Sequence, residues 1–334
     1  MAESAIGPDT INKLRAAADA ACAMQAGMEL DLFTPLKDGP MAAAQIAAAI
    51  GVKSDRLRLL LWALVAAGLL TEQDGRFANT PEANHYLVKG LPSYLGYLHG
   101  TLANAWSLRL KTAASLRTGV PQARMDFAKS SPEQLESFLR RINANSVATT
   151  RSLLARHDFS SFKTLADVGC GGAGFAMTVA QHCPNLQVTA IDLPEITPIT
   201  QRIVNEENAA ARVAVIAADV LAGPLPGSYD AVVLRALLQV LSAPDARQAI
   251  KNTAAALSPG GKMFIVGQIL DDSRISPSES VGFNLNFINS FDAGEAYTEA
   301  EHREWLGEAG LVEIERASYM LVGGNGLITA RKPN

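Results

Sequence analysis

The sequence predicts an α/β protein with a mostly parallel sheet, preceded by a smaller all-α domain of the winged-helix type. Two short apolar runs, 165–168 and 188–191, have the character of buried parallel strands, and a glycine-rich turn and a helix lie between them. Asp192 ends the second run. In the N-terminal third, helical patterns come before a short hairpin, which is typical of a winged helix.

Composition limits the class of protein. With 334 residues the chain is long enough for two domains, and its net charge of −4 argues against a nucleic-acid or membrane partner. No apolar signal core stands at the start and no run of eighteen apolar residues occurs, so we expect a soluble, cytoplasmic protein. Cys22, Cys170 and Cys183 have no metal-ligand spacing, so we expect reduced thiols and no metal.

The N-terminal third carries the winged-helix pattern. A Ser at position 54 would cap the third helix, and Gln73-Asp74-Gly75 would turn the hairpin. The expected elements are helices over 10–37, 42–49 and 54–68, strands over 69–72 and 76–79, and a helix that begins at 80–82.

A winged helix often binds DNA, but this one lacks the residues for it. Acidic residues slightly outnumber basic ones in 1–90, and the presumed recognition helix is mostly apolar, with two arginines near its start. We therefore expect residues 1–90 to bury their apolar helices against a second subunit, which predicts a homodimer.

The segment 91–150 reads as helices between the two domains. Its aromatic side chains and a histidine would either cover an acceptor pocket or pack between domains: Tyr94, Tyr97, His99 and Trp106. Arg124 and Arg141 would either meet an anionic substrate or lie in solvent.

The strongest motif is the glycine turn, residues 169–174, where Gly169, Gly171 and Gly174 have G-x-G-x-x-G spacing. Glycines there let the backbone turn tightly and approach a ligand at the start of a helix. Asp192, after the second strand, would accept both hydroxyls of a ribose, which predicts a nucleoside cofactor. A nicotinamide enzyme should carry this motif near its start, whereas Asp167 before the turn suits the ammonium of an amino acid.

The C-terminal half continues the same alternation. Asp219 follows the third strand and Val220 would pack on an adenine ring, while a capping box at 298–301 opens a helix. The carboxyl ends of parallel strands meet where ligands bind in such sheets. The expected elements are helix 197–206, strands 213–216, 229–234 and 263–266, helix 298–309, and strands 311–316 and 327–331.

These features together resemble the small-molecule O-methyltransferases that use S-adenosylmethionine (AdoMet). The resemblance covers about residues 12–330 and rests on DVGCGGAG at 167–174, AIDLPEI at 190–196, AADVL at 217–221, LSPGGK at 257–262 and AYTEAEHREWLGEAGL at 296–311. It implies a winged-helix dimerisation domain (1–90), a helical linker that contributes to the acceptor pocket (91–150) and a Rossmann-like AdoMet-binding domain (151–334). The cofactor-binding residues it implies are Asp167, Gly169, Gly171, Gly174, Asp192, Leu193, Asp219, Val220 and Arg235.

The chain departs from this family at the proposed catalytic position. The family commonly has a histidine base after its fourth strand, where this chain has Gln239, and a supporting glutamate after the fifth, where it has Gly267. A glutamine amide does not accept a proton near pH 7, so general-base catalysis of roughly 10²–10⁴-fold is unavailable from Gln239. His99 is the alternative base that the resemblance offers.

Three explanations stay open. The acceptor needs no deprotonation, as with a thioether or a phenol of low pKa; another residue acts as the base; or the chain binds AdoMet as a non-catalytic, regulatory dimer. We favour the first, because polar residues lie where the family lines its acceptor pocket. One branch of the family S-methylates a methylthio-hydroxy acid in dimethylsulfoniopropionate synthesis, and this activity is compatible with the polar residues Asn284, Asn286 and Asn289.

Overall fold

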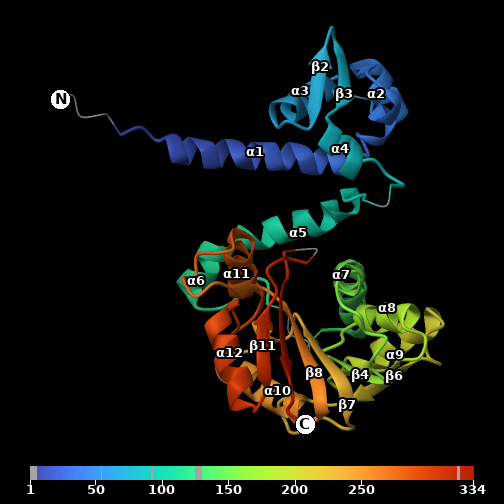
Figure 1. Ribbon diagram of the computed structural model, residues 1–334. Coiled ribbons are helices and arrows are strands. Elements are labelled where there is room, and N and C mark those ends of the chain that lie inside the picture. The colour runs from blue at the N-terminus through green and yellow to red at the C-terminus, as the bar shows by residue number, and fades with distance from the viewer. Residues whose placement is uncertain (1–5, 54, 92, 125–129, 322–323) are drawn as a thin grey trace. The chain divides into compact units, whose positions relative to one another are not determined.

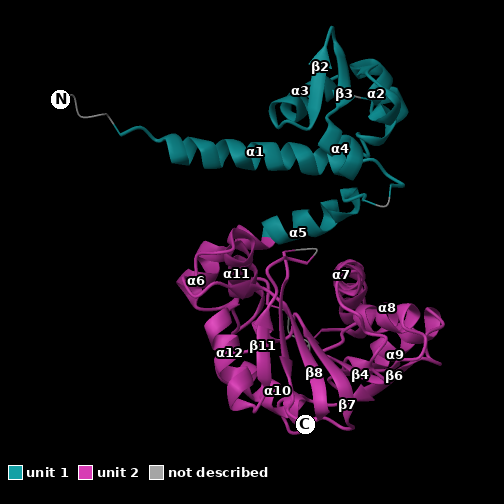
Figure 2. Cartoon of the chain, in the orientation of Figure 1, with its two compact units in different colours: residues 1–107 teal, residues 108–334 magenta. Residues whose placement is uncertain are grey.

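The computed structural model describes residues 6–53, 55–91, 93–124, 130–321 and 324–334. The chain divides into two compact units, residues 1–107 and 108–334, which Figure 2 colours separately. The boundary falls near the end of helix α5 (His99–Arg109). The helical segment 91–150 is therefore divided between the two units.

The first unit contains the helices and the hairpin that the sequence predicts for a winged helix. The first helix ends at Glu29, earlier than the expected limit at residue 37, and the chain turns at Asp31 with a left-handed φ of 52°. The elements are α1 (Asp9–Glu29), η1 (Thr34–Asp38), β1 (Met41–Ala42), α2 (Ala43–Ala49), α3 (Leu57–Ala66), β2 (Leu70–Gln73), β3 (Arg76–Asn79), α4 (Pro81–Tyr86) and η2 (Gly96–Leu98).

The hairpin and the helix after it are confirmed. Strands β2 and β3 pair antiparallel around Asp74 and Gly75, and β1 adds a third strand beside β3. The hydroxyl of Thr80 accepts the backbone N–H of Ala83 at 3.4 Å, which caps α4. Ser54, the predicted cap of α3, lies outside the described residues.

The second unit is built on a seven-stranded sheet with the order β11-β12-β8-β7-β4-β5-β6. Neighbouring strands from β8 to β6 are parallel, and β12 is antiparallel to both β8 and β11. The strands are β4 (Thr164–Val168), β5 (Gln187–Asp192), β6 (Val213–Ala217), β7 (Tyr229–Arg235), β8 (Leu257–Gly267), β11 (Val312–Arg316) and β12 (Gly326–Arg331). The chain order reverses at β4, between β7 and β5, which is where ligands bind in open α/β sheets.

Helices cover both faces of this sheet, and each face has its own apolar core. One core joins Val232 and Ile265 of the sheet to Ile250 and Trp305, and the other joins Val233 to Phe175. Figure 1 shows these helices around the sheet. The helices of the second unit are α6 (Thr112–Thr118), α7 (Pro132–Leu154), α8 (Gly174–His182), α9 (Thr197–Glu206), η3 (Leu238–Val240), α10 (Ala243–Ala255), α11 (Ser278–Ser290) and α12 (Glu299–Glu308).

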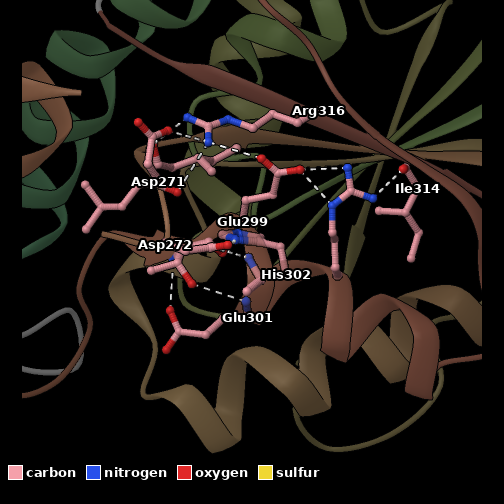
Figure 3. Close-up of polar contacts among 12 residues, drawn as sticks. Asp271, Asp272, Glu299, Glu301, His302, Ile314 and Arg316 are labelled. Atoms are coloured by element: carbon pink, nitrogen blue, oxygen red, sulfur yellow. Dashed lines mark hydrogen bonds and ion pairs between the residues drawn. The ribbon is translucent and has the colours of Figure 1, made fainter. Parts of the chain in front are cut away.

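A polar network fixes the start of α12 beside the strand pair β9 (Ile269–Leu270) and β10 (Tyr297–Thr298). The hydroxyl of Thr298 accepts the N–H of Glu301 at 3.2 Å, and the Glu301 carboxylate accepts the N–H of Thr298 at 2.7 Å. This confirms the predicted capping box. Arg316 of β11 pairs with Asp271 at 2.7 Å and with Glu299 at 3.3 Å, as Figure 3 shows.

Of the helices in the described ranges, none is long and apolar enough to span a membrane.

Candidate cofactor and acceptor site

The glycine turn leaves β4 and enters α8 with a backbone that suits glycine. Gly169 and Gly171 have φ angles of 71° and 53°, in the left-handed region that L residues rarely adopt. The N–H groups of Gly169 and Cys170 both donate to the carbonyl of Ile191, at 2.9 and 3.1 Å. The turn is therefore tied to the end of β5, where Asp192 stands.

Two side chains that the sequence analysis did not single out hold this turn. Asn143 of α7 donates Nδ2–H to the carbonyl of Gly172 at 2.8 Å and accepts the N–H of Gly174 at 3.1 Å. The Thr200 hydroxyl of α9 donates to the carbonyl of Gly171 at 2.6 Å. A Cβ on Gly172 would lie 2.7 Å from Oδ1 of Asn143, so a larger residue there would displace this amide.

Asp192 points at the glycine turn from the end of β5. Its Oδ2 accepts the N–H of Gly171 at 2.7 Å, and its Oδ1 accepts the N–H of Leu193 at 2.8 Å. Burial raises the pKa of this carboxyl, although both hydrogen bonds act in the opposite direction. Each carboxylate oxygen can accept more than one hydrogen bond, so both can still receive a hydroxyl from a ligand.

Asp167, which is buried, and Arg235, which is half-buried, carry opposite charges at the same edge and influence each other electrostatically. Strands β4 and β7 pair Val168 with Leu234, which sets Arg235 level with the start of the turn. Asp167 is buried and its Oδ2 accepts the N–H of Ala176 at 3.2 Å. Burial raises the pKa of Asp167 to about 7, while the charge of Arg235 lowers it. Burial likewise lowers the pKa of Arg235, which Asp167 opposes.

The segment after β6 completes this edge. Ala218 donates its N–H to the carbonyl of Asp192 at 2.9 Å, and Asp219 accepts the N–H of Leu221 at 2.9 Å. The carbonyl of Val220 accepts Nδ2–H of Asn252 at 2.7 Å. The glycine turn, Asp192 and this segment are thus joined by hydrogen bonds at the edge where the sequence analysis expects the cofactor, and their role in binding it stays a prediction.

The side-chain oxygen of Gln239 is hydrogen-bonded within the protein. Its Oε1 accepts the backbone N–H of Gln268 at 2.7 Å, and a Cβ on Gly267 would lie 2.5 Å from that oxygen. Gln239, Gln268 and His302 are among the residues that line a small cavity. The volume of this cavity that water can occupy is about 10 Å³. This space holds a water molecule at most, so it is not the acceptor pocket.

His302, which the sequence analysis did not single out, lines this cavity. Its Nδ1 lies 2.8 Å from the carbonyl of Thr298, and a carbonyl only accepts, so Nδ1 carries the proton. Burial lowers the pKa of His302, although this hydrogen bond opposes the shift. His302 is therefore expected to be neutral near pH 7.

The predicted acceptor residues of α11 have different surroundings. Asn289 is fully buried: the Ser115 hydroxyl donates to its Oδ1 at 2.7 Å, and its Nδ2 donates to Thr112 at 2.8 Å. A role for Asn289 in acceptor binding would require these bonds to break. Asn284 accepts the N–H of Ala296 at 2.8 Å. Asn286 instead meets a charged group, because Nε–H of Arg109 donates to its Oδ1 at 3.3 Å.

The remaining predicted acceptor residues have contacts within their own units. In the first unit, Nδ1–H of His99 donates to the carbonyl of Gly96 at 2.9 Å, and the rings of Tyr94 and Tyr97 are 6.3 Å apart. Trp106 is half-buried in α5. In the second unit, the Arg141 guanidinium lies 5.5 Å from the centre of the Phe138 ring. Their roles at an acceptor site stay predictions.

Metal ligands are not gathered anywhere in the ranges the structure covers, where no three His, Cys, Asp or Glu side chains come together to hold an ion. The hydrogen-bonded carboxylates, the glycine turn and the strand order are typical of a cofactor-binding domain of the α/β class.

The family models identify this class further. The model described as an O-methyltransferase domain matches residues 114–312, and the one described as an O-methyltransferase dimerisation domain matches residues 18–89. The chain belongs to the O-methyltransferase family. This confirms the predicted fold class and enzyme class, a methyltransferase of a family that depends on AdoMet.

Individual relatives agree with this family. Over 92% of this chain and 91% of the relative, the sequence is 30% identical to 3-hydroxy-5-methyl-1-naphthoate 3-O-methyltransferase of Streptomyces sahachiroi. It is 28% identical to the tetracenomycin polyketide synthesis 8-O-methyltransferase TcmO of Streptomyces glaucescens, over 98% and 97% of the two chains. The solved structure of SibL, an S-adenosylmethionine-dependent methyltransferase, matches with 25% identity and a TM-score of 0.83, over 98% and 100% of the chains.

Proposed function

We propose that this chain transfers a methyl group from AdoMet to a hydroxyl oxygen of a small aromatic acceptor, without proton removal by residue 239. The observation that carries this proposal is the hydrogen bond from the N–H of Gln268 to Oε1 of Gln239 at 2.7 Å. The side chain at the family's base position is thereby used to hold the end of β8. The acceptor must therefore reach the site ionised, or lose its proton to another group.

The residues at the glycine turn fit AdoMet. The turn brings backbone close to a ligand, Asp192 keeps lone pairs for the ribose hydroxyls, and buried Asp167 would meet the ammonium group. Arg235 would lie along the methionine end. Asp219 would accept the adenine amino group, with Val220 against the ring. When bound, AdoMet supplies an electrophilic methyl group on its sulfonium sulfur.

Positioning would then be the main contribution of the protein to the rate. Holding a nucleophile and a methyl group in line can lower a barrier by about 7–11 kcal/mol. A phenol of low pKa is ionised near neutral pH and needs no base. The hydroxynaphthoate and polyketide relatives, named for O-methylation, support a hydroxyl acceptor.

A sulfur acceptor is the second candidate, and the same Gln239 contact favours it. A thioether has no proton to lose, so a methylthio-hydroxybutyrate type of acid would also react without a base. Neither of the two relatives compared above is named for sulfur methylation. We therefore rank S-methylation second.

We also propose a homodimer formed by the first unit. Its apolar surface is large for a solvent-facing domain, since Ile11, Leu14 and Trp62 are 62%, 66% and 53% exposed. The matching dimerisation domain supports this association. Size-exclusion chromatography with light scattering tests it, and a monomer at micromolar concentration would contradict it.

The test of the function is release of S-adenosylhomocysteine from AdoMet with phenols, hydroxynaphthoates, aliphatic alcohols, small thioether acids and no acceptor, at pH 6 to 9. O-methylation predicts turnover on a phenol that rises with pH and follows the pKa of the acceptor. Turnover on a thioether alone, nearly flat with pH, would establish the second candidate. No turnover above the blank on any acceptor would overturn both.

A further inference from the structure

Arg109 is a partly buried cation that no acidic side chain of the described residues pairs with. It is the last residue of α5 and belongs to the second unit. Its Nε–H donates to Oδ1 of Asn286 at 3.3 Å. Within the described ranges, no carboxylate lies within 4.0 Å of its guanidinium, and its two Nη groups have no acceptor. Burial, unopposed by any acid, lowers its pKa.

This environment differs from that of the neighbouring cations. Arg124 pairs with Asp292, and the exposed Lys111 reaches the carbonyl of Gln122 at 3.5 Å. A charge that loses water without gaining a counter-charge costs free energy. A ligand anion beside Arg109 would supply the missing counter-charge.

Asn286 stands on α11, the helix whose apolar side chains pack beside the residue that follows Gln239. Asn286 directly precedes Phe287, and Phe287 belongs to an apolar cluster against which Val240 packs. Val240 is the residue after Gln239, the family's base position. The rings of Phe283 and Phe287 are 5.2 Å apart on the same helix. Asn286 therefore shares its helix with aromatic side chains that belong to the apolar cluster beside Val240.

Among the described residues, the side-chain groups of Arg109 and Asn286 that have no partner are all donors. The two Nη groups of Arg109 form a planar fork that matches a carboxylate, which two parallel hydrogen bonds can hold. Nδ2 of Asn286 has no acceptor among the described residues either, and Asn286 as a whole residue is 9% exposed. Donors without acceptors favour an anionic group over a hydroxyl or an amine.

We propose that Arg109 and Asn286 bind a carboxylate of the acceptor, so that the substrate is an aromatic carboxylic acid methylated on another position of its ring system. This inference rests on the proposed function and adds the substrate class. Arg109 is a specificity-determining residue in this proposal and takes no part in proton transfer.

The test compares 2-naphthol with hydroxynaphthoates that carry the carboxylate at different ring positions, using the full-length chain. For at least one hydroxynaphthoate, we expect a KM at least tenfold below that of 2-naphthol. Arg109→Ala should raise this KM at least tenfold, because a charge-assisted contact is lost. The KM for 2-naphthol and the kcat should change less than threefold.

Two further variants separate binding from folding. Asn286→Asp keeps the acceptor for Nε of Arg109 but adds a competing carboxylate, so it should raise the KM for the hydroxynaphthoate alone. Arg117→Ala removes an exposed arginine of α6 and serves as the matched control, with both KM values unchanged.

The outcomes distinguish the two proposals. Turnover on naphthol and hydroxynaphthoates with equal KM in the wild type overturns the carboxylate site and leaves the proposed function standing. Equal losses on both acceptors in Arg109→Ala, with Asn286→Asp neutral, also overturn it. If no acceptor turns over, calorimetry in the presence of S-adenosylhomocysteine decides: failure of any hydroxynaphthoate to bind more tightly than 2-naphthol overturns the site as well.

Discussion

The amide of Asn143 donates to the carbonyl of Gly172 at 2.8 Å, and its oxygen accepts the N–H of Gly174. Helix α7 therefore holds the glycine turn although it lies about 30 residues earlier in the chain. This contact gives the turn a fixed shape before any ligand enters. Replacing Asn143 should therefore weaken the binding of the cofactor.

Asn143→Ala should weaken AdoMet binding and lower stability, because it leaves the Gly174 N–H and the Gly172 carbonyl without partners. We expect at least fivefold weaker affinity in calorimetry and a free energy of unfolding lower by about 1–3 kcal/mol. Asn145→Ala, an exposed position on the same helix, is the matched control. Equal affinity in both variants would show that the turn keeps its shape without α7.

Asp192→Ala should weaken AdoMet binding at least tenfold if this carboxylate holds the ribose. The variant also frees the N–H groups of Gly171 and Leu193, so part of the loss comes from the turn. Asp192→Asn separates the two effects, because its amide oxygen can still accept one of these N–H groups. Calorimetric affinity unchanged in Asp192→Ala would refute the assignment.

The sequence alone predicted the positions of the glycine turn and of Asp192 in the fold. This was possible because the first strand, the turn, the helix and the second strand follow one another within 30 residues. No single pattern there identifies the site, but their order along the chain does. Asn143 and Thr200 were missed, since their contacts reach across 31 and 29 positions from helices whose patterns indicate only burial. Structure alone shows which polar helix residues meet the turn.

The asparagines of α11 show the opposite error, in which residues were assigned to the acceptor site from their polarity alone. Polar residues in this helix suggest a polar acceptor pocket, yet Asn289 faces Ser115 and Thr112 of the neighbouring α6. A polar side chain that bonds another helix and one that bonds a ligand give the same pattern. The hydrophobic periodicity of a helix gives no information about a hydrogen bond to a residue 174 or more positions away in the sequence.

A double-mutant cycle tests the fixed position of Gln239. Gly267→Ala would place a Cβ 2.5 Å from its Oε1, so we expect a loss of about 1–3 kcal/mol in the free energy of unfolding. In the Gln239→Ala background, Gly267→Ala should cost clearly less, because the clash is gone. Gly307→Ala, where a Cβ meets nothing within 4 Å, is the control and should be neutral or slightly stabilising. Additive urea-unfolding energies would contradict the contact.

If Asp167 meets the ammonium group of AdoMet, its raised pKa should make cofactor affinity depend on pH. Burial raises this pKa to about 7, with the Arg235 charge acting in the opposite direction and Asp192 adding to the rise. An ammonium group pairs with the ionised carboxylate, so below pH 7 binding must first expel a proton. AdoMet affinity should therefore increase roughly tenfold or more from pH 5.5 to 7.5. Above about pH 8 it should fall again as the amine of AdoMet loses its own proton.

Calorimetry in buffers of different ionisation enthalpy measures this directly. In the wild type, binding at pH 5.5 should release close to one proton, and release should fall toward zero near pH 7.5 as Asp167 ionises unaided. Asp167→Asn should bind more weakly and lose the rise between pH 5.5 and 7.5, while its amide oxygen can still accept the N–H of Ala176. A wild-type affinity that is flat over this range would mean that the carboxylate of Asp167 does not meet the ammonium group.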